Sequence, residues 1–279
     1  MLNIKKILLP VDFPNTSMRV IHQAATLAQH FHSEIVMLHV VTEPGMPEDG
    51  LGSAGWDMLA EIIRGDQSLE PELDGLAIKR KLVKGGVAHS IVQTAEEEKA
   101  DLIMMPSYGH TFSQFLLGYV TANVLQGTEC PVWTDAHLEG LLSQKFAIRN
   151  VLCAIDFNSY NHNTVSWAAQ MAAEFGASLT LAHVTAGVEI WGPGGSWVNP
   201  EWKEVLVGYA SEHIAEMQQK MGIKADVFIG SGDVPKVLSQ AAKQTNADLL
   251  VTGCNPYGGH LRTHGYSIIC AVPVPVLSV

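Results

Sequence analysis

Two glycine-containing loops contain the residue types in this 279-residue chain that are best suited to chemistry. One spans residues 106–119 and the other residues 253–265, and each separates a short apolar run from a helical pattern. Main-chain N–H groups of such a loop, together with the start of the following helix, can bind a phosphate or another anion. The loops therefore predict binding of an anionic ligand.

The chain contains one pattern twice. Residues 6–40 and 150–184 match without a gap at an offset of 144 residues. A repeat of this length indicates a duplicated domain, because solenoid repeats are shorter, at roughly 20–50 residues. Identical positions include Asp12/Asp156, Phe13/Phe157, Ala24/Ala168, Ala28/Ala172 and His39/His183. We expect one domain over residues 1–136, a linker over 137–148 and a second domain over 149–279.

Composition excludes several classes of function. The net charge of −11 and the absence of basic blocks argue against nucleic-acid or membrane-surface partners. No apolar run approaches the roughly 18 residues that span a bilayer, and the four scattered cysteines are typical of reduced thiols. We therefore expect a cytoplasmic protein.

Catalytic and metal-binding patterns are missing or weak. The sequence has neither a Gly-x4-Gly-Lys-Ser/Thr loop nor a Gly-x-Ser-x-Gly elbow. His39 and His183 recur at strand ends, where local hydrogen bonding is the favoured interpretation. The pairs His30/His32 and His260/His264 have ligand-like spacing, but no context supports zinc. We expect no enzyme, with a weak ATPase as the least favoured alternative, and no metal other than Mg²⁺ accompanying a nucleotide.

Apolar runs alternate with amphipathic patterns along each half. The runs predict strands at 7–11, 35–41, 77–83, 102–105, 132–134, 151–155, 179–184, 224–229, 249–252 and 274–279. Helices are predicted at about 20–31, 56–64, 87–99, 112–125, 164–175, 200–221, 234–245 and 264–271. Residues 43–55 and 187–200 are rich in Gly and Pro and are predicted to be loops.

This alternation predicts an α/β fold with parallel strands and right-handed crossovers in each half. Ligands of such sheets bind at the carboxyl ends of the strands, where the strand order reverses. We expect Asp12, His39 and the loop after Met105 to converge there if the first strand is central.

Four segments give the first half a resemblance to the universal stress protein family. They are the strand ending at Asp12, the LHV of residues 38–40, the KADLIMM of 99–105 and the CPVW of 130–133. With the repeat, the chain resembles the tandem two-domain form of that family. The resemblance implies two doubly wound, flavodoxin- or Rossmann-like sheets of five parallel strands in the order 3-2-1-4-5. It also implies pairing of the two domains within the chain, or a homodimer.

Many members of that family bind ATP through a Gly-x2-Gly-x9-Gly-Ser/Thr motif after strand four. Here Pro106 replaces the first Gly, only eight residues separate Gly109 from Gly118, and Tyr119 replaces the Ser/Thr. Proline removes an N–H donor, which weakens the match. The site residues that the resemblance implies in the first domain are Asp12, Val40, Gly86, Ser107, Gly109, Gly118, Tyr119 and Thr121. The alternative for Asp12 is a cap on the following turn.

The second domain departs further from the motif. Pro256 replaces its second Gly, although Gly253 and Gly265 remain. The weaker candidates there are Asp156, Val184, Gly253 and Gly265. Trp191 and Trp197 lie in a loop that is either a lid over the sheet or a ligand or partner surface.

The sequence leaves two functions open. The first is a stress-response protein with a regulatory role that binds an adenine nucleotide, ATP, in its first domain. The second is an interaction or dimerisation protein of the same fold that binds no nucleotide and has degraded sites in both domains.

Overall fold

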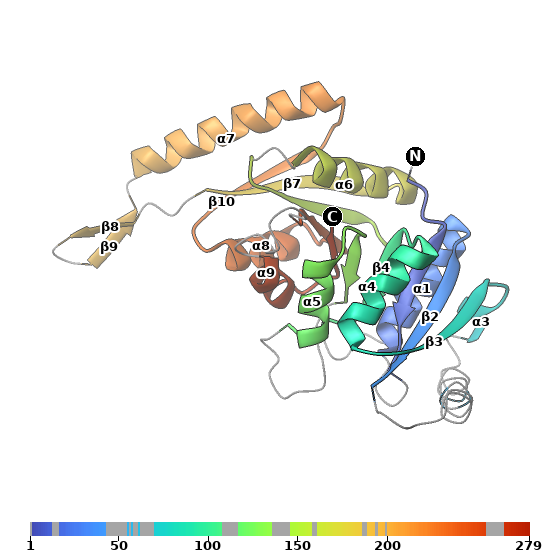
Figure 1. The fold of residues 1–279 in the computed structure, drawn as a ribbon. Helices are drawn as coiled ribbons and strands as arrows, with labels where there is room; N and C mark the ends of the chain where they lie inside the picture. The colour runs from blue at the N-terminus through green and yellow to red at the C-terminus, as the bar shows by residue number, and fades with distance from the viewer. Residues whose placement is uncertain are drawn as a thin grey trace. The chain divides into compact units, whose positions relative to one another are not determined.

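The computed structural model of the chain describes most of its residues. They are residues 2–12, 17–42, 55, 57, 61, 70–107, 117–135, 146–157, 161–185, 189–192, 195–198, 200–254 and 265–279. The chain divides into two compact units, Asn3–Ala147 and Ile148–Val279, here called the N-terminal unit and the C-terminal unit. Strands and helices alternate through both (Figure 1).

The N-terminal unit contains five parallel strands in the order β3-β2-β1-β4-β5. The strands are β1 (Lys6–Pro10), β2 (Glu34–Val41), β3 (Ile78–Lys84), β4 (Leu102–Met105) and β5 (Val132–Thr134). Its helices in the described residues are α1 (Met18–Phe31), α3 (Glu70–Leu73), α4 (Val87–Glu98) and α5 (Tyr119–Gly127).

The C-terminal unit repeats this topology, with five parallel strands in the order β10-β7-β6-β11-β12. The strands are β6 (Asn150–Ile155), β7 (Ser178–Thr185), β10 (Asp226–Ser231), β11 (Leu249–Thr252) and β12 (Val276–Ser278). The helices are α6 (Asn161–Phe175), α7 (Pro200–Met221), α8 (Val234–Gln244) and α9 (Gly265–Ala271).

The predicted α/β fold and strand order are confirmed in both units. The register also repeats, since Ile7 pairs with Ile35 and Val151 with Leu179. The interior strand β4 is buried along its whole length, as expected for a strand covered on both faces. That the strands form two separate sheets, that the first domain ends at residue 136 and that the second begins at residue 149 stay predictions.

Helix packing explains why these sequences wind in this way. The buried side of α1 includes Ala24, Ala25 and Ala28, whose small side chains let the helix lie close to the strands. With right-handed crossovers, the chain covers one face on the way from β1 to β3 and the other face on the way from β3 to β5. The two faces enclose a core built around Leu8, Leu38 and Ile103.

Two predictions about local structure are wrong. The predicted helix 112–125 is interrupted at Gly118, which is the N-cap residue of α5, while residues 112–116 lie outside the described residues. The predicted loop 187–200 contains an antiparallel hairpin of β8 (Glu189–Gly192) and β9 (Gly195–Val198), in which Ile190 pairs with Trp197. Residues 43–54 and most of the predicted helix 56–64 lie outside the described residues.

A carboxylate clamps the amino ends of the strands in both units. Asp101 Oδ2 accepts hydrogen bonds from the main-chain N–H groups of Lys5 and Lys6, at 2.8 and 2.9 Å. Asp248 Oδ2 accepts from Arg149 and Asn150 at the same two distances. In each unit, therefore, the aspartate that precedes the fourth strand fixes the start of the first strand.

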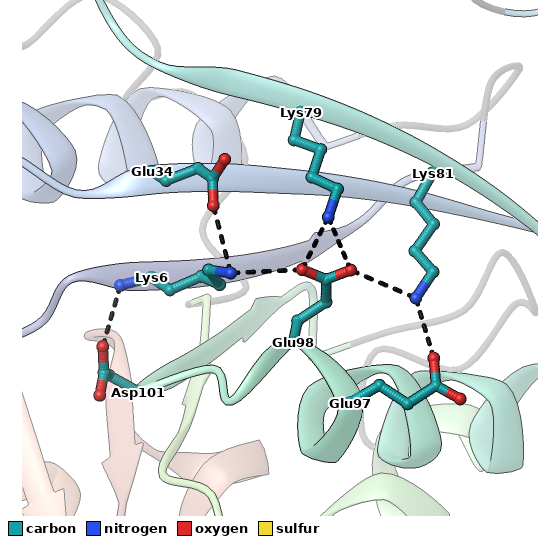
Figure 2. Close-up of polar contacts among 7 residues, drawn as sticks. All are labelled: Lys6, Glu34, Lys79, Lys81, Glu97, Glu98 and Asp101. Atoms are coloured by element: carbon teal, nitrogen blue, oxygen red, sulfur yellow. Dashed lines mark hydrogen bonds and ion pairs between the residues drawn. The ribbon is translucent and has the colours of Figure 1, made fainter.

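An ion-pair network surrounds this clamp in the N-terminal unit (Figure 2). Glu98, at the end of α4, accepts from Lys79 Nζ at 2.9 Å and from Lys6 and Lys81 at 3.3 Å. The Lys79 ammonium, followed by those of Lys6 and Lys81, lowers the pKa of Glu98 to about 2. The network fastens the end of α4 to β1 and β3.

Candidate functional site

The strand order of the N-terminal unit reverses at β1, which lies between β2 and β4. Asp12 follows β1 at this carboxyl edge and is exposed. His39, near the end of β2, donates from Nδ1 to the main-chain carbonyl of Val11 at 3.0 Å. Since this bond assigns the proton to Nδ1, the neutral ring presents Nε2 as an acceptor. Local bonding was the favoured interpretation of His39, and this contact agrees with it.

Gly85 and Gly86 form the turn from β3 to α4 at the same edge. Gly85 has φ +152°, and its N–H donates to the carbonyl of Val41 at 3.2 Å. Gly86 is the exposed N-cap of α4, and nothing lies within 4 Å of the place where a Cβ would be. Val40, half-buried on β2, pairs with Val83 two residues before this turn. The turn thus leaves open space at Gly86.

The loop after β4 is tied together where it leaves the sheet and where it returns. Gly118 N donates to the carbonyl of Ser107 at 2.9 Å, and Thr121 Oγ1 donates to the carbonyl of Pro106 at 3.0 Å. We call these four residues the loop base. Tyr119, the first residue of α5, is 83% exposed, so its ring contributes little to this packing. Gly109 lies outside the described residues.

The hydroxyl groups of the loop base face the protein. Ser107 is buried, and its Oγ donates to the carbonyl of Asp135 at 2.6 Å. Thr121 is also buried, with its proton on the Pro106 carbonyl. Phosphate oxygens accept hydrogen bonds, and each hydroxyl has only one proton to give. An anion at this edge would therefore depend on main-chain N–H groups.

A buried polar network that sequence reasoning missed lies behind the loop base. Asp135 is 7% exposed and its carboxylate accepts from Gln23 Nε2 at 3.1 Å. Gln23 Oε1 accepts in turn from Trp133 Nε1 at 2.7 Å. Arg19 Nε lies 3.9 Å from the same carboxylate. The network therefore connects α1, the end of β5 and the loop base.

The carboxyl edge of the C-terminal unit has the same framework with different chemistry. His183 donates from Nδ1 to Ile155 O at 2.9 Å, and Gly232, at φ +119°, donates to Thr185 O at 3.2 Å. The residue after that glycine is Asp233 rather than glycine, and its carboxylate accepts from Lys236 N to cap α8. A carboxylate therefore occupies the helix start that Gly86 leaves open.

The remaining candidates of the C-terminal unit are distributed along this edge. Asp156 is exposed after β6, and Val184 is half-buried on β7 beside Gly230. Gly253 and Gly265 are buried at the end of β11 and the start of α9. The N–H of Cys254 donates to Val279 O at 2.6 Å, which uses one donor that follows the strand.

Phe157 stacks on His183 at this edge. The ring centroids are 4.0 Å apart and the planes are tilted by 30°. Burial lowers the pKa of His183, and its hydrogen bond to Ile155 only partly opposes that shift. His183 immediately precedes Val184, so the stack lies near the end of β7.

The arrangement of candidate metal ligands and of cysteines gives little support to metal or thiol chemistry. Among the described residues no group of three or more His, Cys, Asp or Glu side chains is arranged to hold a metal ion. All four cysteines are free, as expected, and burial raises the pKa of Cys130 to about 12. No helix in the described residues is long and apolar enough to cross a membrane.

Doubly wound α/β sheets bind their ligands outside the carboxyl ends of the strands, at the point where the strand order reverses. The family model described as the universal stress protein family matches residues 3–134 and again residues 147–277. The chain therefore belongs to that family, in its tandem two-domain form.

A curated relative agrees with this assignment, and two solved structures are similar in fold. The universal stress protein MJ0531 of Methanocaldococcus jannaschii is 32% identical over 139 residues, covering 46% of this chain and 79% of the relative. A universal stress protein from Archaeoglobus fulgidus matches in structure with a TM-score of 0.67 and 22% identity, over 99% of this chain and 96% of that one. A functionally unknown protein from Pseudomonas aeruginosa gives 0.71 and 15%, over 99% and 92%. The two structures support the fold.

Proposed function

We propose that the N-terminal unit binds an adenine nucleotide, ATP, at its carboxyl edge, and that the chain acts as a regulator in the stress response. Two helices of that unit, α4 and α5, begin directly after the glycines Gly86 and Gly118. The first N–H groups of a helix have no acceptor within the helix, and they favour negative charge. These two glycine-capped helix starts are the observation that carries the proposal.

The proposed pose follows from the strand ends. The phosphates would lie at the glycine-capped helix starts, with Mg²⁺ accompanying them, and the base would lie along the end of β2 beside Val40. Asp12, exposed after β1, would accept from a ribose hydroxyl. Gly109 would belong to the phosphate loop. Ser107, Tyr119 and Thr121 would shape that loop without donating to the ligand from their side chains.

A binding role fits these residues better than turnover. The buried hydroxyl groups of Ser107 and Thr121 donate to main-chain carbonyls rather than to a general base, which a hydrolytic nucleophile needs. A regulator of this kind would respond to nucleotide concentration through altered contacts with a partner. A cytoplasmic location, pairing of the two units within one chain and a homodimer belong to the same proposal.

The C-terminal unit supplies the experiment, because its helix cap can be exchanged with that of the N-terminal unit. Gly86→Asp places the carboxylate of Asp233 at the start of α4. At φ −72° and ψ 126° the position accepts any residue, and the space is open. We expect ATP affinity to fall roughly tenfold to a hundredfold, the equivalent of losing one charge-assisted hydrogen bond. Isothermal titration calorimetry measures this.

The matched control is the reverse exchange, Asp233→Gly, which should leave ATP affinity unchanged. Equal losses in both variants would show that the N-terminal unit is not the site. If the folded wild-type protein shows no saturable heat with millimolar ATP, the nucleotide proposal is wrong.

A second candidate function is an interaction protein that binds no nucleotide. It is favoured by the loop base, where the Ser107 and Thr121 hydroxyls donate to main-chain carbonyls and Pro106 supplies no N–H. This candidate predicts that light scattering will find a stable dimer whose mass is insensitive to ATP. Nucleotide that co-purifies with the protein, detected by mass spectrometry, would contradict it.

A further inference from the structure

The equivalent outer strands of the two units, β3 and β10, differ in charge. Among the described residues each of them pairs on one side only, β3 with β2 and β10 with β7. The other side of such an edge strand can pair with a strand of another chain unless charged side chains prevent it. Four residues of β3 are basic, namely Lys79, Arg80, Lys81 and Lys84, whereas β10 carries one charge, on Asp226. The edge at β10 therefore lacks the protection that β3 has.

Hydrogen bonds to β7 identify the main-chain groups of β10 that point outward. Gly232 N donates to Thr185 O at 3.2 Å, and Gly230 O accepts from Thr185 Oγ1 at 3.2 Å. Both groups therefore face β7. Because successive residues of a strand direct their N–H and C=O groups to alternate sides, those of Val227 and Ile229 point away from β7. The side chain of Val227 is also 45% exposed, so this edge is accessible to another strand.

The sequence of β10 is complementary to a second copy of itself. Antiparallel pairing through the outward groups places the two-fold axis at Phe228 or at Ile229. The first register sets Val227 opposite Ile229 of the second copy, and the second sets it opposite Ser231. Apolar cross-strand pairs of this kind stabilise a sheet. Neither register brings the two Asp226 residues opposite each other.

Self-pairing of β3 would instead bring like charges together. Gly85 N, directly after β3, donates to β2 at 3.2 Å, so alternation directs the main-chain groups of Arg80, Leu82 and Lys84 outward. An axis at Lys81 sets this lysine opposite itself. An axis at Leu82 sets Arg80 opposite Lys84 of the other copy. Like charges that lie directly opposite each other destabilise a sheet, so self-pairing is disfavoured at β3 and allowed at β10.

An exposed apolar stripe accompanies the β10 edge. Helix α7 packs against β7 and β10 (Figure 1), and its Trp202, Val205 and Tyr209 are 56%, 60% and 58% exposed. Residues at these spacings lie on one side of a helix. The two-fold axis of an antiparallel strand pair is perpendicular to the sheet, so self-pairing of β10 brings both α7 helices to one face. The stripes can then cover each other.

We propose that β10 and α7 form the surface through which two copies of this chain associate, with β10 pairing antiparallel to β10. The inference rests on one element of the proposed function, the homodimer, and names its surface; it does not depend on the nucleotide. Stable interfaces bury roughly 1,200–2,000 Å² in total. Two six-residue strands and three exposed side chains from each copy place this interface at the lower end, so we expect a dimer that dissociates on dilution.

An exchange of equivalent edge residues tests the surface. Arg80 pairs with Met37, and Val227 pairs with Leu181, the residue that matches Met37 in the repeat. Val227→Arg places the charge of β3 on β10, where pairing would remove the guanidinium from water. We expect the dissociation constant of the dimer to rise roughly tenfold or more. Arg80→Val is the matched control and should leave it unchanged. Sedimentation equilibrium of the full chain measures both.

A second variant acts on the main chain. Val227→Pro removes an N–H group that points away from β7, so the β7–β10 ladder keeps its hydrogen bonds while antiparallel pairing loses one. We expect it to weaken the dimer as Val227→Arg does. Circular dichroism of each variant verifies that the fold is retained.

Hydrogen exchange locates the interface directly. The amides of Val227 and Ile229 should exchange more slowly as the protein concentration rises, because pairing gives them acceptors, whereas those of Arg80 and Leu82 should not change. If a dimer forms but these amides stay unprotected, or if folded Val227→Arg dimerises like the wild type, the interface is elsewhere and the inference is wrong. A chain that stays monomeric at millimolar concentration also overturns it and leaves the edge to a strand of another protein.

Titration of the same proteins with ATP separates this inference from nucleotide binding. Val227→Arg should bind ATP as the wild type does, because the substitution lies in the C-terminal unit. A wild type that dimerises through β10 without saturable ATP binding would sink nucleotide binding by the N-terminal unit and support the surface. A monomer that binds ATP would have the opposite meaning.

Discussion

Each unit has its own aspartate clamp at the start of its first strand, and different interactions surround the clamp in the two units. Asp101 and Asp248 each hold two main-chain N–H groups at the start of the first strand of their unit. Around Asp101 the contacts are ionic, with Glu98 as the central acceptor. Around Asp248 they are neutral, because Ser178 Oγ donates to Asn150 Oδ1 and Asn150 Nδ2 donates to Asn246 O. The clamp is thus common to the fold, and its surroundings have diverged.

The carboxyl edges show the same division. In both units a histidine donates to the end of the first strand and a glycine of positive φ closes the turn after the third. The difference lies in the next position, where Gly86 leaves the helix start open and Asp233 fills it. The two units therefore share the framework of this edge and differ in the charge at the start of the helix that follows the third strand.

The largest expected effect concerns the Gln23 network, which only the N-terminal unit contains among the described residues. Gln23→Leu would leave Trp133 Nε1 without its buried acceptor and remove one donor from the Asp135 carboxylate. Each lost partner costs about 1–3 kcal/mol, so we expect a loss of roughly 3 kcal/mol in the free energy of unfolding. Urea denaturation measures it.

The corresponding position in the C-terminal unit is Trp167, and Trp167→Phe is the control, expected to change stability by less than about 1.5 kcal/mol. Similar losses from both variants would mean that the network has no special role in the N-terminal unit.

The clamp itself should give the next largest effect, and an equal one in both units. Asp101→Ala and Asp248→Ala each remove an acceptor from two main-chain N–H groups, a loss of about 2 kcal/mol. Amide hydrogen exchange should accelerate at Lys5 and Lys6 in one variant and at Arg149 and Asn150 in the other. Asp101→Asn and Asp248→Asn keep a carbonyl oxygen and should lose about half as much. An effect confined to one unit would contradict a shared clamp.

The smallest expected effect is a pH dependence that separates the units. Glu98 has its pKa lowered from 4.5 to about 2, chiefly by Lys79. Its contribution to stability is therefore complete above about pH 4.5 and disappears as the pH falls toward 2. Because such a network contributes on the order of 1 kcal/mol, hydrogen exchange should show the N-terminal unit losing about that much over this interval.

Glu98→Gln should remove this dependence and lower stability at pH 7 by a similar amount. The neutral contacts of Asn150 predict no matching change in the C-terminal unit. A Glu98→Gln variant that kept the full pH dependence would assign the effect to another carboxylate.

The sequence predicts the strands well, because buried parallel strands are apolar runs, as in residues 102–105. It also predicts the repeated topology, since the register of the second unit follows that of the first. The β8–β9 hairpin had a usable signal, because β-prone residues flank the Gly-Pro-Gly-Gly of residues 192–195. Asp233, before a Pro near the helix start, was likewise readable as a helix cap.

The polar contacts of the site could not be predicted from the sequence. Gln23 and Asp135 are 112 residues apart, and no periodicity indicates that they meet. Nor does the residue type reveal whether a hydroxyl serves the ligand or the main chain, as Ser107 and Thr121 illustrate. Such choices depend on the distance between loop ends, which only the folded chain defines.

The loop base has a consequence for how this protein family can change. The chain leaves β4 and enters α5 at a point fastened by its own hydrogen bonds, so the two ends of the segment between them are held together. The entropic penalty for lengthening such a segment grows only slowly. The segment between Ser107 and Gly118 can therefore be replaced or lengthened without a change in the core. In this way the same scaffold can acquire or lose a ligand.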